Sequence, residues 1–116
     1  MRLASSQLAH IPLIVIEGEC DHGSAKALHA AVEDALSADP RAILLDMEKC
    51  TYIDSGGISV LLGAVRRLRG SGWLGVLAPN DNVRRLLEIV GLTVDTGFRV
   101  FDDPLDASLA LKDLGD

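Results

Sequence analysis

Hydrophobic positions along the chain follow two alternating patterns. Short runs of branched aliphatic residues that end near Gly or Pro are typical of buried strands, whereas segments with an apolar residue at every third or fourth position are typical of amphipathic helices. The patterns predict strands at 11–18, 42–47, 72–79 and 97–103, with a shorter strand near Leu3. They predict helices within 21–40, 55–69, 80–91 and 103–114, and a short link at 48–54.

The alternation of strands and helices predicts an α/β layer fold with right-handed crossovers. The 116 residues contain no internal repeat and no long linker, so we expect a single domain over residues 1–116. Helix 103–114 carries a strong start signal, because Asp103 is a suitable cap and Pro104 takes the first helical position.

Composition narrows the possible functions. The formal net charge of -6 argues against direct nucleic-acid binding and favours a partner with a basic surface. The first apolar run, residues 11–16, is shorter than a membrane span or the core of a signal peptide. We therefore expect a cytoplasmic protein without membrane insertion.

Two cysteines are too few for a disulfide framework. Cys20 and Cys50 follow apolar runs and are expected to be buried, unpaired and reduced, with a redox role as the alternative. His10, His22 and His29 form no ligand motif with them and are expected in loops or on the surface. The chain is accordingly expected to need no metal and no cofactor.

The start of helix 55–69 has an unusual composition, Asp54-Ser55-Gly56-Gly57. The first N–H groups of a helix lack partners within it, and the helix dipole makes this end partly positive. A phosphate on Ser55 could be held there, and the glycines would let another protein approach the hydroxyl. The alternative is that Asp54 or Ser55 serves only as an N-cap and the glycines only allow tight packing.

Two enzymatic interpretations of the same segment do not fit. The Gly-x-x-x-x-Gly-Lys pattern of a phosphate-binding loop is absent. A nucleophile elbow has Gly two residues before the serine, where this chain has Ile53. We therefore predict no catalytic residue.

Other conspicuous side chains have ordinary structural explanations. Arg66, Arg67 and Arg69 lie opposite the apolar stripe of their predicted helix, which indicates a solvated face. The alternative is that part of this face lies in a partner interface, since the same helix carries Ser55. Trp73 and Tyr52 have apolar neighbours and are expected to be buried or partly buried.

Three segments carry a family resemblance. Residues 46–70, DMEKCTYIDSGGISVLLGAVRRLRG, resemble the signature of the STAS domain, and more closely that of the small bacterial anti-sigma factor antagonists. Residues 17–28 resemble the family's Gly-Glu-Leu-Asp segment, and residues 83–111 resemble its C-terminal part. The resemblance implies the STAS fold: one small mixed β-sheet of four to five strands, with about four helices packed on it.

The resemblance also implies a function. The family's phosphorylated serine matches Ser55, and its partner- and kinase-binding surface matches Asp21, Asp54, Gly56 and Gly57. An unphosphorylated antagonist binds an anti-sigma factor that is also a serine kinase, and so frees a sigma factor. The kinase uses ATP to phosphorylate the antagonist, which then dissociates, and a phosphatase removes the phosphate.

This chain departs from the family pattern at two positions. Gly56 replaces a hydroxyl residue beside the phosphoserine, and Cys20 replaces an aliphatic residue. Some STAS proteins are not phosphorylated and act as scaffolds or accessory subunits, for example of a lipid-transport ATPase complex, and that is the alternative function. The sequence leaves both a monomer and a dimer open.

Overall fold

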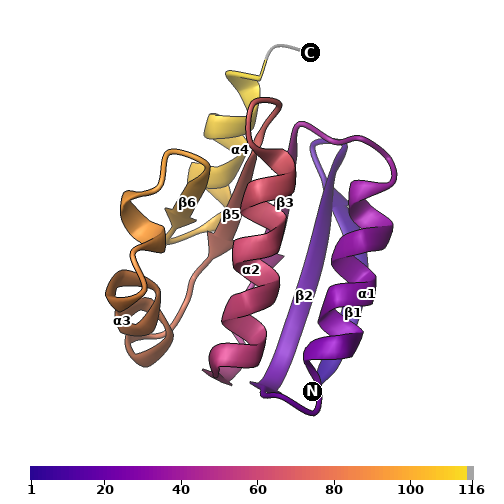
Figure 1. Cartoon of the computed structure of the whole chain (residues 1–116). Helices are drawn as coiled ribbons and strands as arrows, with labels where there is room; N and C mark the ends of the chain where they lie inside the picture. Colours follow the sequence, from indigo (N-terminus) through magenta and orange to yellow (C-terminus); the bar gives the residue numbers. More distant parts are fainter. Residues whose placement is uncertain (115–116) are drawn as a thin grey trace.

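The computed structural model describes residues 1–114, which form a mixed sheet of six strands with four α-helices around it (Figure 1). The strands are β1 (Arg2–Leu8), β2 (Ile11–Cys20), β3 (Ala42–Asp46), β4 (Cys50–Ile53), β5 (Trp73–Leu77) and β6 (Phe98–Phe101). The helices are α1 (Ala25–Leu36), α2 (Ser55–Leu68), α3 (Asp81–Ile89) and α4 (Pro104–Lys112), with a 3-10 turn η1 (Leu92–Val94). Strand order is β1-β2-β3-β5-β6, and β4 pairs with β2.

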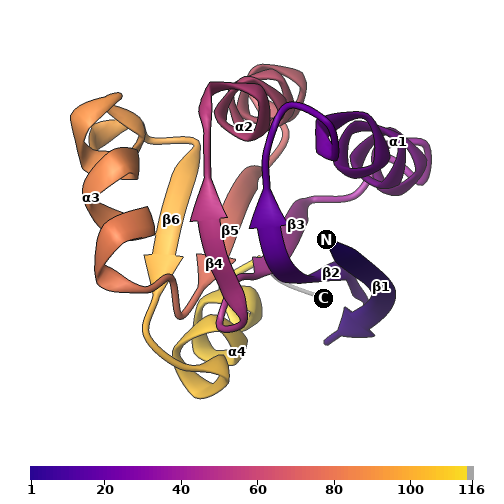
Figure 2. The same cartoon turned by 90° about the horizontal axis from the view of Figure 1, so that it is seen from below.

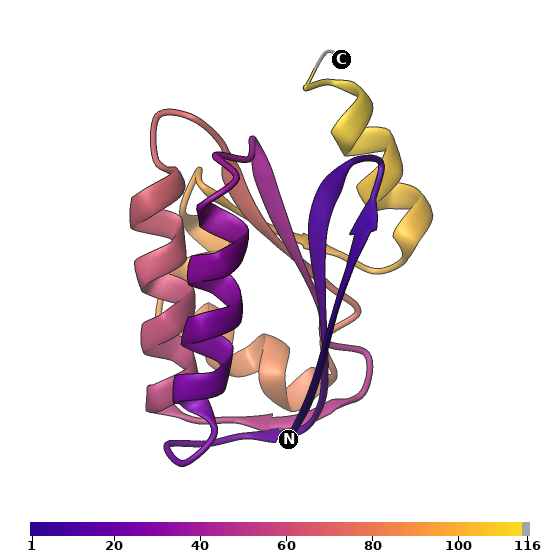
Figure 3. The same cartoon turned by 90° about the vertical axis from the view of Figure 1, so that its right-hand side faces the viewer.

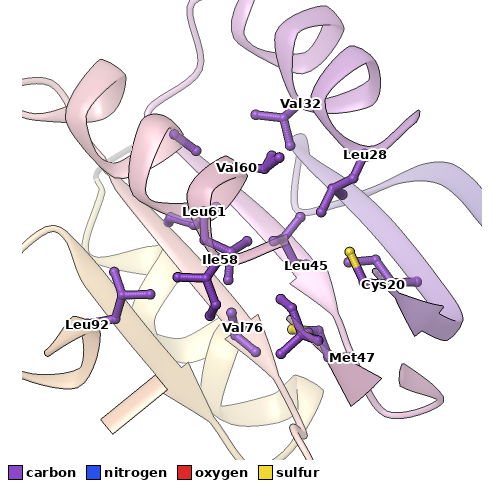
Figure 4. Packing of buried hydrophobic residues seen from close by; sticks show 14 of the residues in the cluster. Cys20, Leu28, Val32, Leu45, Met47, Ile58, Val60, Leu61, Val76 and Leu92 are labelled. Atoms are coloured by element: carbon purple, nitrogen blue, oxygen red, sulfur yellow. The ribbon is translucent and has the colours of Figure 1, made fainter. Parts of the chain in front are cut away.

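Helices cover both faces of the sheet. Helices α1 and α2 lie side by side on one face, and α4 packs on the opposite face (Figure 3). Because both faces are covered, strands β3 and β5 are buried almost throughout, as expected for central parallel strands. Figure 4 shows Leu28 of α1 and Ile58 and Leu61 of α2 gathered around Leu45 of β3, in the larger of two hydrophobic clusters.

The predicted α/β class, the mixed sheet and the four helices are confirmed, but the link at 48–54 contains a strand that the hydrophobic pattern does not predict. Strand β4 has only four residues, and Thr51 and Tyr52 within it are exposed. So short and half-exposed a segment lacks the aliphatic run that marks the other strands. With β4 and the hairpin strand β1 included, the sheet has six strands, where four to five were expected.

Strand β2 organises the region where α1 and α2 begin. Its first half pairs in parallel with β3, and its last three residues, Gly18–Cys20, pair in parallel with β4. The register shifts between Gly18 and Glu19, where Gly18 adopts a φ of 89° and donates its N–H to the Lys49 carbonyl (2.9 Å). Strands β2 and β4 therefore end together, directly before the two helices (Figure 2).

No helix within residues 1–114 has the length and apolar character that crossing a bilayer requires.

Candidate functional site

Two aspartates stand at the carboxyl ends of the neighbouring parallel strands β2 and β4. Cys20 is aligned with Ile53 at the last paired position, so Asp21 and Asp54 follow side by side. The backbone N–H of Asp54 donates to the carbonyl of Cys20 (3.1 Å), which joins the two strand ends. The structure thus brings together two site residues that are 33 positions apart in the sequence.

The side chain of Asp54 caps α2. Its Oδ1 accepts hydrogen bonds from the N–H groups of Gly56 (2.8 Å) and Gly57 (3.4 Å), and its carbonyl accepts from Ile58 (2.9 Å). The sequence predicted that the first N–H groups of this helix have no partner and are open to a phosphate. That expectation is wrong for these three groups, because each donates a hydrogen bond to Asp54. Between the two capping possibilities, the structure selects Asp54.

Ser55 is the first residue of α2 and is exposed to solvent. Its carbonyl accepts a hydrogen bond from the Ser59 hydroxyl (2.8 Å), one turn further along. Because the capping role belongs to Asp54, the Ser55 hydroxyl is available for chemistry with another molecule.

The two glycines that follow have different surroundings. Gly57 is buried, and a Cβ there would lie 2.6 Å from Ile53 Cγ1 and 2.8 Å from Cys20 Sγ. Gly57 therefore has a packing role, and its membership of a partner-binding surface stays a prediction. Gly56 is half-buried, and its Cβ would lie 3.1 Å from both Asp54 Oδ1 and His22 Nδ1.

Asp21 organises the loop before α1. Its Oδ1 accepts hydrogen bonds from the N–H and the hydroxyl of Ser24 (both 3.0 Å), and its own N–H donates to Ser24 Oγ (2.9 Å). The next residue, His22, donates its N–H to Asp54 Oδ2 (3.0 Å), and its Nδ1 lies 3.5 Å from the same oxygen. His22 thus lies against the candidate site, although the sequence predicted only a loop or surface position for it, since no local pattern predicts a contact across 32 positions.

Hydrogen bonding sets the charge state of Asp54. Partial burial on its own raises the pKa of Asp54, but the N–H groups of Gly57, Gly56 and His22 and the His22 side chain favour the carboxylate and together lower the pKa below its ordinary value. The site is therefore negatively charged at neutral pH.

The two cysteines below the site are buried and unpaired, as predicted. Burial, followed by the electrostatic influence of Cys50, Asp54 and Asp21, raises the pKa of Cys20 to about 11. Burial also raises the pKa of Cys50. Both groups are therefore protonated thiols at neutral pH and act as small hydrophobic side chains.

The other candidate side chains are placed mostly as expected. Arg66, Arg67 and Arg69 are exposed, and two of them pair with acids, Arg67 with Glu33 (3.1 Å) and Arg69 with Asp95 (2.9 Å). The three histidines are exposed, and residues 1–114 contain no group of three or more His, Cys, Asp or Glu side chains that could hold a metal ion.

The two aromatic predictions have different outcomes. Trp73 is buried, as predicted, but the prediction for Tyr52 is wrong, because this side chain is 50% exposed. Tyr52 points outward from β4 and lines an open groove of about 400 Å³ together with Ile53 of β4 and Leu86 and Ile89 of α3. Sequence reasoning missed this groove because it missed β4.

The family model described as "Mlab, STAS domain" matches residues 4–100. This chain belongs to the STAS domain family. It is 29% identical over 102 residues to the anti-sigma-F factor antagonist RsfB of Mycobacterium tuberculosis, an alignment that covers 88% of this chain and 82% of RsfB. The predicted resemblance to anti-sigma factor antagonists is thus confirmed.

Solved structures share the STAS fold. The unphosphorylated antagonist SpoIIAA has a TM-score of 0.74 at 19% identity, covering 99% of this chain and 100% of SpoIIAA. Its phosphorylated form, from Bacillus, also gives 0.74, at 20% identity over 95% of this chain and 99% of that chain. A sulfate transporter family protein from Wolinella succinogenes gives 0.68 at 24% identity, over 88% and 84%.

Proposed function

We propose that this STAS protein is an anti-sigma factor antagonist that works as a binding module without catalysis of its own. In its unphosphorylated form it binds a kinase-type anti-sigma factor in the cytoplasm, and a sigma factor is released. The anti-sigma factor then transfers a phosphate from ATP to Ser55, which ends the complex, and a phosphatase removes the phosphate.

The observation that carries this proposal is the exposed Ser55 hydroxyl at the first position of α2, with its capping role taken by Asp54. Replacement of the hydroxyl hydrogen by a phosphoryl group therefore breaks no hydrogen bond that caps the helix. The names of the curated relatives and the phosphorylated form of SpoIIAA support the same proposal.

Electrostatics supplies a reason for release. The phosphate brings a charge of about -1.5 to -2 at neutral pH, on the residue that follows Asp54, where the chain runs beside Asp21. A unit charge pair about 5 Å apart is worth roughly 3 kcal/mol at an effective dielectric near 20, and under about 1 kcal/mol in water. A penalty of about 1–3 kcal/mol in the bound state weakens binding roughly 5- to 150-fold.

The test combines phosphosite mapping with affinity measurement. The chain is incubated with ATP and the anti-sigma factor kinase that it captures from its own cells, the phosphosite is mapped by mass spectrometry, and affinity is measured before and after. We expect the phosphate on Ser55, weaker binding by Ser55→Asp, and binding by Ser55→Ala that ATP does not reverse. Ser71→Asp is the control, because Ser71 is exposed at the opposite end of α2.

A second candidate is a STAS scaffold without phosphorylation, such as an accessory subunit of a lipid-transport ATPase. The Mlab description of the family model and the likeness to a sulfate transporter family protein favour it. Capture of transporter subunits, with no phosphate on Ser55 and equal binding by the unchanged protein and Ser55→Asp, would contradict the antagonist proposal and support this one.

A further inference from the structure

Three N–H groups at the start of α2 are already hydrogen-bonded to Asp54 and are not open to a phosphate. The N–H groups of Gly56 and Gly57 donate to Asp54 Oδ1, and that of Ile58 donates to the Asp54 carbonyl. A phosphate on Ser55 would moreover lie beside the carboxylate of Asp54. A site that accepts this dianion in the free protein needs a counter-charge from another element.

The loop between β2 and α1 places an imidazole at this position. The backbone of His22 is fixed by its hydrogen bond to Asp54 Oδ2 (3.0 Å), while its side chain is 79% exposed and its Nδ1 lies 3.5 Å from that oxygen. Gly56 directly follows Ser55 and has no side chain. A Cβ built on Gly56 would lie 3.1 Å from His22 Nδ1 and 3.2 Å from His22 Cα. The ring therefore lies against the residue that follows the phosphoacceptor.

We propose that His22 is the phosphate-facing residue of this site, and that its protonated imidazole binds the phosphate on Ser55. This inference rests on the proposed phosphorylation of Ser55. The imidazole already lies beside a carboxylate, and because the side chain is exposed, it can turn from Asp54 toward the phosphate without disturbing the core. Asp54 is the ionisable group that lies against the ring, and Asp21, which precedes His22 in the chain, has its carboxylate hydrogen-bonded to Ser24.

The inference also gives Gly56 a role. A hydroxyl residue at this position would place its Cβ 3.1 Å from both His22 Nδ1 and Asp54 Oδ1, a tight contact from which the exposed ring would have to shift. The absence of a side chain at Gly56 thus allows the His22 imidazole to lie close to the backbone beside Ser55. A ring nitrogen from the neighbouring loop can then act where the family has a hydroxyl group. Gly56→Ser should push the ring away and weaken its contact with the phosphate.

Phosphorus-31 NMR tests this directly, with phosphoserine inserted at position 55 during translation so that no kinase is needed. Phosphoserine loses its second proton at about pH 6, within the range in which a histidine changes charge. We expect the titration midpoint of the phosphate to be lower in the otherwise unchanged protein than in His22→Gln. The difference should be about half a pH unit, the size expected for one unit charge about 5 Å away in water.

Two further variants make the test specific. His22→Lys should keep the low midpoint, because it keeps a positive charge, whereas His29→Gln should have no effect, since His29 lies on α1 beside Glu33 (3.5 Å). Equal midpoints in His22→Gln and the unchanged protein would overturn the role of His22. That result would leave the antagonist function intact, because the antagonist function fails only if the kinase leaves Ser55 unmodified or the phosphate leaves affinity unchanged.

Discussion

Helices α2 and α4 both begin with an aspartate cap, but different residues follow it. In α4, Asp103 Oδ1 accepts a hydrogen bond from the Asp106 N–H (3.0 Å), and Pro104 is the first helical residue. In α2, Asp54 accepts from Gly56 and Gly57, and Ser55 takes the position that Pro104 has in α4. The first turn of α4 thus contains residues that favour a helix start, whereas that of α2 contains two of the poorest helix formers.

The difference shows where each helix start gets its stability. Helix α4 begins with favourable local residues. The start of α2 depends on contacts with the end of β2 and the loop after it. Its N-cap Asp54 donates its N–H to Cys20 and accepts from the His22 N–H, and Gly57 approaches Cys20 closely. Because tertiary contacts fix α2, its first residue need not be chosen for helix formation, and a serine can stand there.

The largest expected effect comes from filling the space at Gly57. Gly57→Ala places a methyl group within 3 Å of Ile53 and Cys20 side-chain atoms, and overpacking of this kind costs about 1–3 kcal/mol. The control is Gly63→Ala in the same helix, where no atom lies within 4 Å, and which should stabilise by about 0.5–1 kcal/mol. Urea unfolding of both variants measures the difference, and equal effects would show that packing at Gly57 is unimportant.

Removing the two caps should have unequal effects. Asp103→Ala loses one side-chain cap and should destabilise by about 1 kcal/mol. Asp54→Ala also loses bonds to two glycines and to the His22 N–H, so its loss of stability should be clearly greater. Denaturant midpoints compare the two variants. Equal losses would mean that the link between the β2 and β4 ends adds nothing to the cap.

The same contrast shows what sequence could and could not predict. Local signals were sufficient for α4, with Asp103 and Pro104, and for the end of α3, where Gly91 adopts a φ of 84°. They also placed Asp54 and Ser55 at the start of α2. They could not predict β4, which is short and half-exposed, or the register shift in β2, and the approach of His22 to Asp54 depends on both.

Local sequence signals also failed to predict the hairpin between β1 and β2, for a different reason. Its two-residue turn, Ala9-His10, has positive φ at both residues (51° and 67°), a geometry that Asn-Gly usually marks. With no Asn or Gly there, the hydrophobic pattern predicts only a short strand near Leu3, whereas β1 runs over the full length Arg2–Leu8.

Acid should weaken α2 through Asp54. The folded protein holds the pKa of Asp54 below its ordinary value, so its contribution is fully present above that value, about 3.9, and is lost as pH falls through the folded pKa. Asp54→Asn keeps a good cap but cannot titrate. The free energy of unfolding of the unchanged protein should therefore fall more steeply than that of Asp54→Asn from about pH 5 to pH 3. Parallel profiles would contradict this role.

The smallest effect is expected at Ser55 itself. Its side chain is exposed, its carbonyl still accepts from Ser59 after substitution, and alanine is a better helix former, so Ser55→Ala should change stability by less than about 0.5 kcal/mol. Ser24→Ala at the start of α1 is the matched control, because the Ser24 hydroxyl accepts from the Asp21 N–H and donates to Asp21 Oδ1. Each such bond contributes about 1 kcal/mol.

Thermal and urea unfolding of the two serine variants decide whether Ser55 is structural. If Ser55→Ala destabilises as much as Ser24→Ala, the Ser55 hydroxyl takes part in holding the fold, and phosphorylation would unfold α2 instead of altering a surface. If only Ser24→Ala destabilises, a phosphate can be added to and removed from Ser55 while Asp54 continues to cap the helix, which is the property that a reversible switch at this position requires.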